Sequence, residues 1–425
     1  MISIEQALEH VIQYAVPKPA QSVPLEKSLG HLLWEDIFSD LDAPPHDQSL
    51  VDGYAVRSTD FCPRAIRAQE GSGNVELEIL EEVTAGNIPT CRVESGRTIR
   101  VMTGVHVPEG ADAVVMLEEV LWQREAGLSR GVARFATREV VAGQNIMPQA
   151  TSLHRGQRVL PSGKRVRPAE IALLAQVGRT DVRVFGRPQV ALLPTGDELV
   201  DVGFLPGPGK IRNSNGPMLA ACARQVGAEV LDLGIGRDDR ESLRAVMAQG
   251  LSADVLVISG GVSAGTLDLV PEVLEDLGVR QVFHKVNLKP GKPLWFGVAD
   301  GVQGDREAGG STLVFGLPGN PVSSFVCFQL FVSTALRRLG GEDLREPIAP
   351  RPSARLARPF EVRGDRVTYA PARLDWTEAG AVLEPVAWHG SGDIRGLVDA
   401  NALAIFPEGG GHYEAGQRIL YHLLD

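Results

Sequence analysis

The chain has few cysteines and no clustered stretch of basic residues. Its four cysteines lie far apart, without the Cys-x-x-Cys or Cys/His spacing that indicates a zinc knot or a redox pair. We therefore expect buried free thiols in a reducing compartment, at Cys62, Cys91, Cys222 and Cys327. The formal net charge of -11 argues against duplex nucleic acid or an anionic membrane surface as a partner, because phosphate contacts need clustered Lys and Arg.

The sequence has no long uninterrupted apolar run, and we expect its first residues to form a helix rather than a signal peptide. Ser3 and Gln6 have capping-box spacing ahead of an interrupted apolar stripe, which predicts an amphipathic helix at the N-terminus. The most apolar segment, 321–336, is broken by serines and a glutamine and predicts a buried helix. We expect a cytoplasmic protein. A length of 425 residues, of which 44% are hydrophobic, predicts two to four domains.

The residue pattern changes twice along the chain. Short alternating runs between Gly, Pro and Asn dominate residues 41–141 and predict a β-rich region. From Arg187, apolar runs end in glycine-rich turns and lead into helical patterns, which predicts a parallel α/β sheet with ligand loops at the carboxyl ends of its strands. A proline-spaced linker after Gly341 leads to short strands, so we expect a small all-β domain at the end.

One glycine-rich loop, within ADVLVISGGVSAGTLDLV, lies between a predicted strand and a helix. Free amides and the dipole at a helix start favour an anion such as phosphate. The candidate residues are Ser259, Gly260, Gly261, Ser263 and Gly265. Asp268 sits among them, where a carboxylate would repel phosphate unless a metal, usually Mg²⁺, bridges the two. A plain strand-to-helix turn is an equally good interpretation of this loop alone.

Further loops carry carboxylates and lysines. Glu198 follows a strand and Asp238 begins a helix, and each alone is better explained as a cap than as a metal ligand. Lys289 and Lys292 bracket a Pro-Gly turn in an acidic chain. Loops after parallel strands gather at one sheet edge, so we expect these groups to reach one ligand, as in a phosphoryl or nucleotidyl site. No P-loop or Rossmann fingerprint is present, which disfavours an ordinary NTPase or dehydrogenase.

Six ordered motifs extend this interpretation over essentially the whole chain: PPHDQSLVDGYAV, VMTGVHVPEGADAVVMLEE, GKIRNSN, VISGGVSAGTLDLV, NLKPGKPLWFG and FGLPGNPVSS. Together they resemble the MoeA family of molybdopterin molybdenumtransferases, whose animal counterpart is the gephyrin E domain. The resemblance implies an enzyme of molybdenum cofactor biosynthesis that inserts molybdate into adenylylated molybdopterin and releases AMP with the help of Mg²⁺ or another divalent cation.

The resemblance also implies an elongated homodimer, with a cleft in which the DGYA domain of one subunit faces the α/β domain of the other. Contact with the adenylyltransferase that supplies the substrate is a further expectation. We predict four domains: a connecting domain (20–40 and 140–186), an inserted β-rich domain with the DGYA and MTG motifs (41–139), a molybdopterin-binding α/β domain (1–19 and 187–336) and a β-barrel-like C-terminal domain (337–425).

The family's functional positions carry over to specific residues of this chain. The catalytic set implied by the resemblance is Asp52, Thr103, Glu198, Asp238, Asp268, Lys285 and Lys289, of which Glu198, Asp238 and Asp268 are the expected metal ligands. The implied substrate-binding set adds to the glycine-rich loop Lys292, Pro318, Pro321, Arg373 and Ser391. In similar proteins an arginine and a serine at the last two positions are implicated in holding molybdate.

The chain departs from the family pattern at several positions. Acidic residues commonly follow GQNI in the family, and in this chain they are replaced by Ala150, Thr151 and Ser152. Asn213 stands where an aspartate is usual. Three alternatives therefore stay open: a catalytically impaired molybdopterin-binding or scaffold homologue, a molybdopterin adenylyltransferase, and a generic sugar or nucleotide phosphate binder. The sequence leaves open the choice between molybdate and tungstate, and which carboxylates bind which metal.

Overall fold

The structure, a computed structural model, divides the chain into two compact units. The described residues are 1–62, 74–122, 131–136, 139–262, 269–300, 310–344, 351–378 and 380–424. Unit 1 comprises Met1–Glu35, Ser162–Ile171 and Asp181–Asp425, and unit 2 comprises Asp36–Pro161 and Ala172–Thr180. The chain passes from unit 1 to unit 2 within helix α3 (Pro168–Gln176), between Ile171 and Ala172. The finer, four-domain division stays a prediction.

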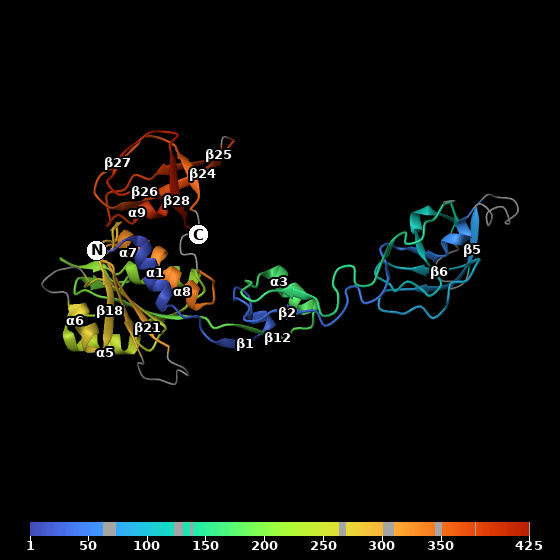
Figure 1. The fold of residues 1–425 in the computed structure, drawn as a ribbon, viewed down its shortest axis with the longest axis horizontal. Helices are drawn as coiled ribbons and strands as arrows, with labels where there is room; N and C mark the ends of the chain where they lie inside the picture. Colours follow the sequence, from blue (N-terminus) through green and yellow to red (C-terminus); the bar gives the residue numbers. More distant parts are fainter. Residues whose placement is uncertain are drawn as a thin grey trace. The chain divides into compact units, whose positions relative to one another are not determined.

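A six-stranded sheet lies at the centre of unit 1 (Figure 1). Its strands in spatial order are β16 (Glu229–Asp232), β13 (Gln189–Pro194), β17 (Val255–Ser259), β21 (Thr312–Leu317), β20 (Trp295–Ala299) and β18 (Val279–His284). The first four are parallel, whereas β20 and β18 run antiparallel to their neighbours. The predicted sheet is therefore mixed, because the turn between β18 and β20 is too short for the crossover that parallel neighbours need.

Helices cover both faces of this sheet, and alternate strand residues contact opposite layers. Val190 and Leu192 pack in one cluster with α1, α4, α7 and α8, whereas Ala191 and Leu193 pack with α5 and α6. Figure 1 shows α1, α7 and α8 on one side and α5 and α6 on the other. These helices are α1 (Ile4–Tyr14), α4 (Asn215–Gln225), α5 (Arg240–Gly250), α6 (Leu269–Asp276), α7 (Pro321–Cys327) and α8 (Ser333–Leu339).

Both helices predicted from the sequence are present. The side chains of Ser3 and Gln6 form the reciprocal capping box at the start of α1. The apolar segment 321–336 is helical and mostly buried, with a π-helical stretch, Phe328–Val332, between α7 and α8. Within the part of the chain that the structure describes, no helix combines the length and apolarity needed to cross a membrane.

The C-terminal part of unit 1 forms a second six-stranded sheet, and the predicted barrel-like domain is confirmed. Pairing of β24 with β26 closes five of its strands into a barrel. The strands in order are β19 (Leu288–Lys289), β24 (Val367–Thr377), β25 (Gly380–Pro385), β22 (Ser353–Leu356), β28 (Arg418–Leu423) and β26 (Ala402–Phe406). Beside them lie the pair β23 (Phe360–Val362) and β27 (Gly411–Tyr413) and the helix α9 (Arg395–Val398).

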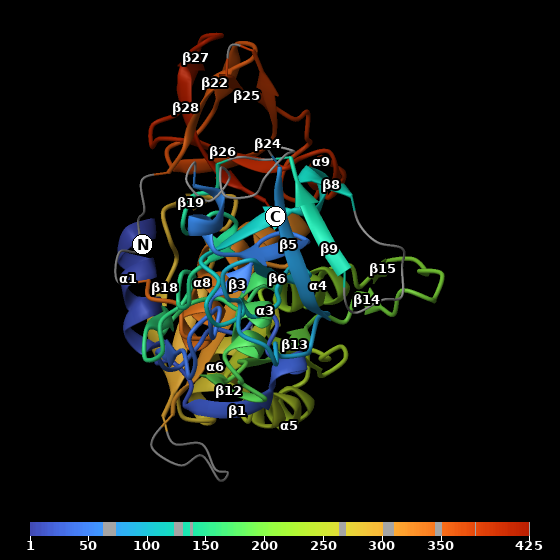
Figure 2. The ribbon, with the colours of Figure 1, turned by 90° about the vertical axis from the view of Figure 1, so that its right-hand side faces the viewer.

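Short elements complete unit 1. Strand β1 pairs antiparallel with β12, and β14 pairs parallel with β15. Figure 2 shows β14 and β15 beside α4. Their bounds are β1 (Ala20–Pro24), β12 (Asp181–Phe185), β14 (Leu199–Val200) and β15 (Ile211–Arg212), with the 3-10 turn η1 at Leu25–Lys27.

Unit 2 is β-rich, as predicted. A six-stranded sheet packs around the buried aromatic side chains of Tyr54, Phe61 and Phe135. Its strands in order are β7 (Ala113–Met116), β4 (Gly53–Val56), β6 (Arg97–Val101), β5 (Val75–Val83), β9 (Gly131–Phe135) and β8 (Val120–Trp122). Two short pairs and two 3-10 turns accompany it: β3 (Gln48–Ser49) with β10 (Ile146–Met147), β2 (Ile37–Phe38) with β11 (Arg158–Leu160), η2 (Ser58–Phe61) and η3 (Leu117–Glu119).

The expectation of four buried cysteines is half wrong. All four thiols are free, but only Cys222 and Cys327 are buried. These two lie on inward-facing positions of α4 and α7, and burial raises the pKa of the Cys222 thiol to about 11. Cys62 and Cys91 are exposed, because they lie in irregular segments where no regular element turns the side chain toward a core.

Candidate functional site

The loops that follow β13, β17 and β21 meet at one edge of the unit 1 sheet. Pro194 is paired with Ser259 and Ser259 with Leu317, so the three strands end at the same level. Just beyond this level the Thr195 amide donates to the Ser259 carbonyl at 2.9 Å, and Thr195 also bridges to Gly236 in the loop after β16. The structure therefore brings together four of the loops that the sequence predicted to converge.

Two glycines after β17 form a cradle that side chains would fill. Gly260 and Gly261 have φ values of 104° and 65°, which residues with a side chain rarely adopt. A Cβ on Gly260 would lie 2.5 Å from the Thr195 carbonyl oxygen, and one on Gly261 would lie 2.8 Å from Cγ2 of Val270. The two glycines therefore let the backbone after β17 pack directly against Thr195 and Val270.

A buried hydroxyl faces the same cradle. Thr195 is only 3% exposed, and its Oγ1 has no hydrogen-bond partner among the described residues. This oxygen would lie 3.1 Å from a Cβ on Gly260 and 3.2 Å from one on Gly261. A buried hydroxyl without a partner costs free energy, so a ligand oxygen in the cradle would satisfy it. Thr195 was missed as a site residue because a lone threonine before a glycine turn carries no functional pattern.

The first residue of α4 connects three of the loops. The Asn215 side-chain Nδ2 donates to Ser259 Oγ at 2.7 Å and to the Gly319 carbonyl at 2.8 Å. Its neighbour Asn213, the residue that replaces the family's aspartate, accepts from the Gly216 amide at 2.9 Å and so caps α4. The departure at Asn213 therefore keeps an acceptor at the helix start. The role of Asn215 was also missed, since the sequence shows only a cap-like NSN.

The predicted carboxylates lie on two adjoining loops. Asp238 Oδ2 accepts from the Asp197 amide at 3.2 Å. The Glu198 carboxylate folds over Gly196, where a Cβ would lie 2.4 Å from its Oε2. Glu198 and Asp238 are both exposed, and their oxygens are of the donor type that Mg²⁺ prefers.

The predicted metal set is only partly described. Asp268, the third expected ligand, lies with Ser263 and Gly265 in 263–268, outside the described residues. In the ranges that the structure covers, no group of three or more His, Cys, Asp or Glu side chains is arranged to hold a metal ion. By donor type, Glu198 and Asp238 still fit a hard cation.

The lysine turn lies at the same sheet edge. Trp295 is paired with Gly316 near the end of β21 and with His284 at the end of β18, so Lys285 begins the turn at this level. The Lys289 ammonium is already bound by the carbonyl oxygen of Arg363 in the C-terminal part. The ammonium groups of Lys285 and Lys292 have no hydrogen-bond or ion-pair partner within the described ranges, which leaves two positive charges for an anion.

The proline turn after β21 contacts the C-terminal part through Ser391. Asn320 Nδ2 donates to Ser391 Oγ at 3.0 Å, and the Val322 amide donates to the Ser391 carbonyl at 3.0 Å. Pro318 and Pro321 flank this contact, and the Ser324 hydroxyl donates to the Pro318 carbonyl. The structure thus joins three predicted residues, Pro318, Pro321 and Ser391, to the loops of the sheet edge.

Arg373 has a different environment. It pairs with Asp375 at 3.1 Å and lines a cavity of about 450 Å³ that also contains Arg358, Glu384 and Asp399. Two carboxylates balance two guanidinium groups there, so this cavity has no excess of positive charge for an oxyanion. The molybdate-holding role of Arg373 stays a prediction.

Asp52 and Thr103 lie next to each other in unit 2. Asp52 Oδ1 accepts from the Thr103 amide at 2.7 Å and from its hydroxyl at 2.8 Å. These two hydrogen bonds lower the pKa of Asp52 below its ordinary value, so the exposed carboxylate stays ionised. Gly53 beside it admits no side chain, because a Cβ would lie 2.1 Å from the Val115 carbonyl oxygen.

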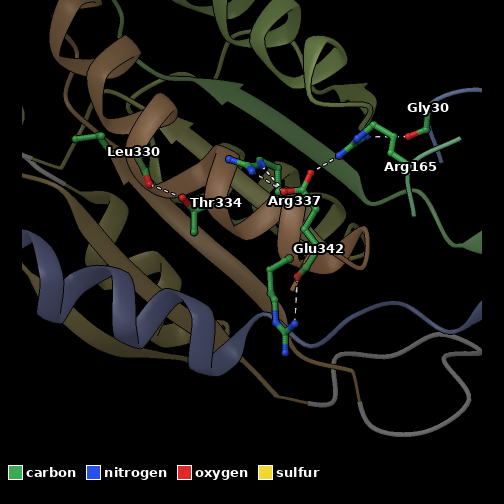
Figure 3. Close-up of polar contacts among 7 residues, drawn as sticks. Gly30, Arg165, Leu330, Thr334, Arg337 and Glu342 are labelled. Atoms are coloured by element: carbon green, nitrogen blue, oxygen red, sulfur yellow. Dashed lines mark hydrogen bonds and ion pairs between the residues drawn. The ribbon is translucent and has the colours of Figure 1, made fainter. Parts of the chain in front are cut away.

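A second cavity in unit 1, of about 840 Å³, lies at the opposite end of β13, near the carboxyl ends of α4 and α8. Glu342 accepts there from Arg165 and from Arg337, and Arg165 also donates to the Gly30 carbonyl (Figure 3). Helix carboxyl ends carry partial negative charge, which such arginines offset. We therefore interpret this cavity as a structural junction.

Three family models match consecutive parts of the chain. "MoeA N-terminal region (domain I and II)" matches residues 2–178, and "Probable molybdopterin binding domain" matches residues 191–338. "MoeA C-terminal region (domain IV)" matches residues 353–424. The loop edge and the lysine turn lie within the second match.

Similar proteins cover nearly the whole chain. Molybdopterin molybdenumtransferases of Staphylococcus aureus (strain Mu50) and Staphylococcus epidermidis (strain RP62A) are each 32% identical to it, across 98% of this chain and 94% of the relative. The crystal structure of a molybdopterin biosynthesis MoeA protein from Pyrococcus horikosii has a TM-score of 0.79 and 31% identity, covering 100% of this chain and 99% of that one. The chain belongs to the MoeA family of molybdopterin molybdenumtransferases.

Proposed function

We propose that this protein inserts molybdate into adenylylated molybdopterin and releases AMP. The observation that carries the proposal is the loop edge of unit 1. There a glycine cradle, the Thr195 hydroxyl and the ammonium groups of Lys285 and Lys292, none of which has a partner in the described part of the chain, provide donors and positive charge for phosphate and an oxyanion. The family relationship identifies the substrate class that such a site would take.

The residues of the cradle would bind and orient the adenylyl phosphate. The Gly261 amide and the Thr195 hydroxyl donate to its oxygens, while Lys285 and Lys292 offset its charge and that of molybdate. The reaction breaks the bond between AMP and the pterin phosphate, and water supplies the oxygen that replaces it. Positive charge around the phosphates stabilises the negative charge that builds up as this bond breaks.

A divalent cation, with Mg²⁺ as the first candidate, would be held by Glu198 and Asp238 together with Asp268. Such an ion neutralises phosphate charge and polarises the phosphorus–oxygen bonds when it is bound. The support for it is the donor type and exposure of the two described carboxylates. Asp52, held ionised by Thr103, would serve as a hydrogen-bond acceptor for substrate.

The catalytically impaired homologue is the alternative with a specific feature in its favour. The segment that replaces the family's acidic residues, Ala150 to Ser152, is exposed or partly exposed. Within it, Thr151 Oγ1 donates to the Pro148 carbonyl. This segment therefore offers no carboxylate to a substrate. The enzyme remains the better proposal, because the glycine cradle, Lys285 and Lys292 are present.

The decisive experiment follows AMP release from adenylylated molybdopterin by the purified protein. Release that requires molybdate and stops in excess chelator supports the proposal. Release without molybdate would contradict insertion, and full release in chelator would remove the carboxylates from the mechanism. A reaction that consumes ATP and forms adenylylated molybdopterin would instead establish the adenylyltransferase alternative.

We also propose a homodimer in the cytoplasm that contacts the adenylyltransferase supplying its substrate. The support is the family relationship alone. Cell fractionation tests the location, and co-purification with the adenylyltransferase tests the contact.

A further inference from the structure

The Asn215 amide has only one orientation that fits its surroundings. Its nitrogen lies 2.8 Å from the Gly319 carbonyl oxygen, which can only accept a hydrogen bond. Turning the amide over would place two acceptor oxygens against each other, so Nδ2 must face Gly319 and Ser259. The position of Oδ1 follows from this.

Asn215 Oδ1 is buried and has no hydrogen-bond partner in the ranges that the structure describes. A buried amide oxygen left without a donor is costly, and such groups in folded proteins need an explanation. The residue lies at the start of α4, beside Ser259, and Ser259 also accepts from the Thr195 amide next to the cradle. A partner for Oδ1 would therefore come from a ligand bound at the loop edge.

The chemistry of Oδ1 restricts what that partner is. An amide oxygen only accepts, so ionised phosphate and molybdate oxygens, which also accept, would not satisfy it. The partner must bring a hydroxyl or an N–H group. In an adenylyl group the ribose carries hydroxyls close to the phosphate, whereas the N–H groups lie on the adenine and on the pterin.

We propose that Asn215 is a substrate-binding residue whose Oδ1 accepts a hydrogen bond from a ribose hydroxyl of the adenylyl group. The inference rests on the proposed function. The same side chain holds the end of β17 and the proline turn together through Ser259 and Gly319. Asn215 would thus contact the nucleoside and both loops at the same time.

The test measures binding of AMP, 2′-deoxy-AMP and 3′-deoxy-AMP to the full chain by calorimetry. Asn215→Ala should weaken AMP binding about five- to ten-fold, as expected for one lost hydrogen bond to a buried acceptor. For one of the two deoxynucleotides, the wild type should already show this loss, and Asn215→Ala should add nothing. That coupling identifies the hydroxyl that Oδ1 contacts.

Ser259→Ala is the matched control, because it removes a partner of Nδ2 and leaves Oδ1 in place. It should change the affinity for all three nucleotides by the same factor. Equal losses for all three in Asn215→Ala as well would show that the residue only supports the loops, and would overturn the proposal. So would an effect confined to adenylylated molybdopterin, which would indicate a pterin N–H as the partner.

A crystal structure with AMP provides a second measurement that does not depend on a variant folding. Asn215 Oδ1 should lie within hydrogen-bond distance of a ribose hydroxyl, and a water molecule bound there in place of the ribose would overturn the proposal. If the wild type binds no AMP while AMP release also fails, the proposed function itself is wrong. If the wild type binds AMP and only the coupling is absent, the error lies in the role of Asn215.

Discussion

At the scale of single residues, the lysines of the turn have unequal roles. The Lys289 ammonium is occupied by the Arg363 carbonyl, whereas Lys292 is exposed and has no partner in the described part of the chain. The sequence placed these lysines together but could not separate their roles, because Arg363 lies 74 residues further along the chain. The free ammonium is therefore the better probe of anion binding.

Lys292→Ala should weaken molybdate and phosphate binding about ten-fold without lowering the melting temperature. A charge-assisted hydrogen bond contributes at least about 1.5 kcal/mol to binding. Because Lys292 is exposed to solvent, we expect the loss of binding free energy to lie near this lower value. Calorimetry with molybdate measures the change. Lys27→Ala, which removes an exposed ammonium from η1 and not from the turn, is the control and should bind molybdate normally. Unchanged affinity in Lys292→Ala would contradict the anion role of the turn.

The Asp52 carboxylate gives a prediction about pH. Hydrogen bonds from Thr103 lower its pKa, so they stabilise the folded state above the ordinary Asp pKa, and this contribution is lost as the pH falls through the lowered value. Thr103→Val removes the hydroxyl bond and should raise the pKa of Asp52. NMR titration of the carboxyl carbon checks the shift, and the acidic limb of the AMP-release profile should move to higher pH with it. Thr103→Ser should keep the wild-type pKa.

At the scale of elements, the sequence predicted the loop edge better than the sheet that forms it. Glycine-rich turns after apolar runs correctly indicated that the loops after β13, β17 and β21 converge. Strand β20 runs against the other five strands, because the turn after β18 is too short for a crossover, and the pattern of each strand taken alone did not indicate this direction. Thr195 and Asn215 could not be predicted either, since their importance depends on which side-chain atoms stay buried and unpaired.

Gly260→Ala should disable the cradle. The substitution forces a side chain into a left-handed conformation and places its Cβ 2.5 Å from the Thr195 carbonyl oxygen. We expect a loss of stability of about 1 to 3 kcal/mol and a large loss of AMP release. Chemical denaturation and the release assay measure the two effects.

Gly278→Ala is the matched control, because Gly278 has a φ of 79° with no heavy atom within 4 Å of its Cβ position. It should cost only the backbone strain and leave AMP release close to that of the wild type. A Gly260 variant with normal activity would show that the close approach at the cradle is not needed.

At the scale of the whole molecule, the chain resembles its relatives over nearly its full length. The homodimer is tested by light scattering coupled to size-exclusion chromatography. We expect a mass of twice the 45.6 kDa of one chain. A single-chain mass at the concentrations used in the activity assay would contradict the dimer.

If the loop edge is the active site, release of AMP and insertion of molybdenum should occur together. A single-turnover reaction with adenylylated molybdopterin, molybdate and excess Mg²⁺ tests it most directly, with released AMP and pterin-bound molybdenum quantified in the same sample. Both products should appear at the same rate and in equal amounts, and Gly260→Ala should abolish both. AMP released without bound molybdenum, or molybdenum bound while AMP stays attached, would contradict it.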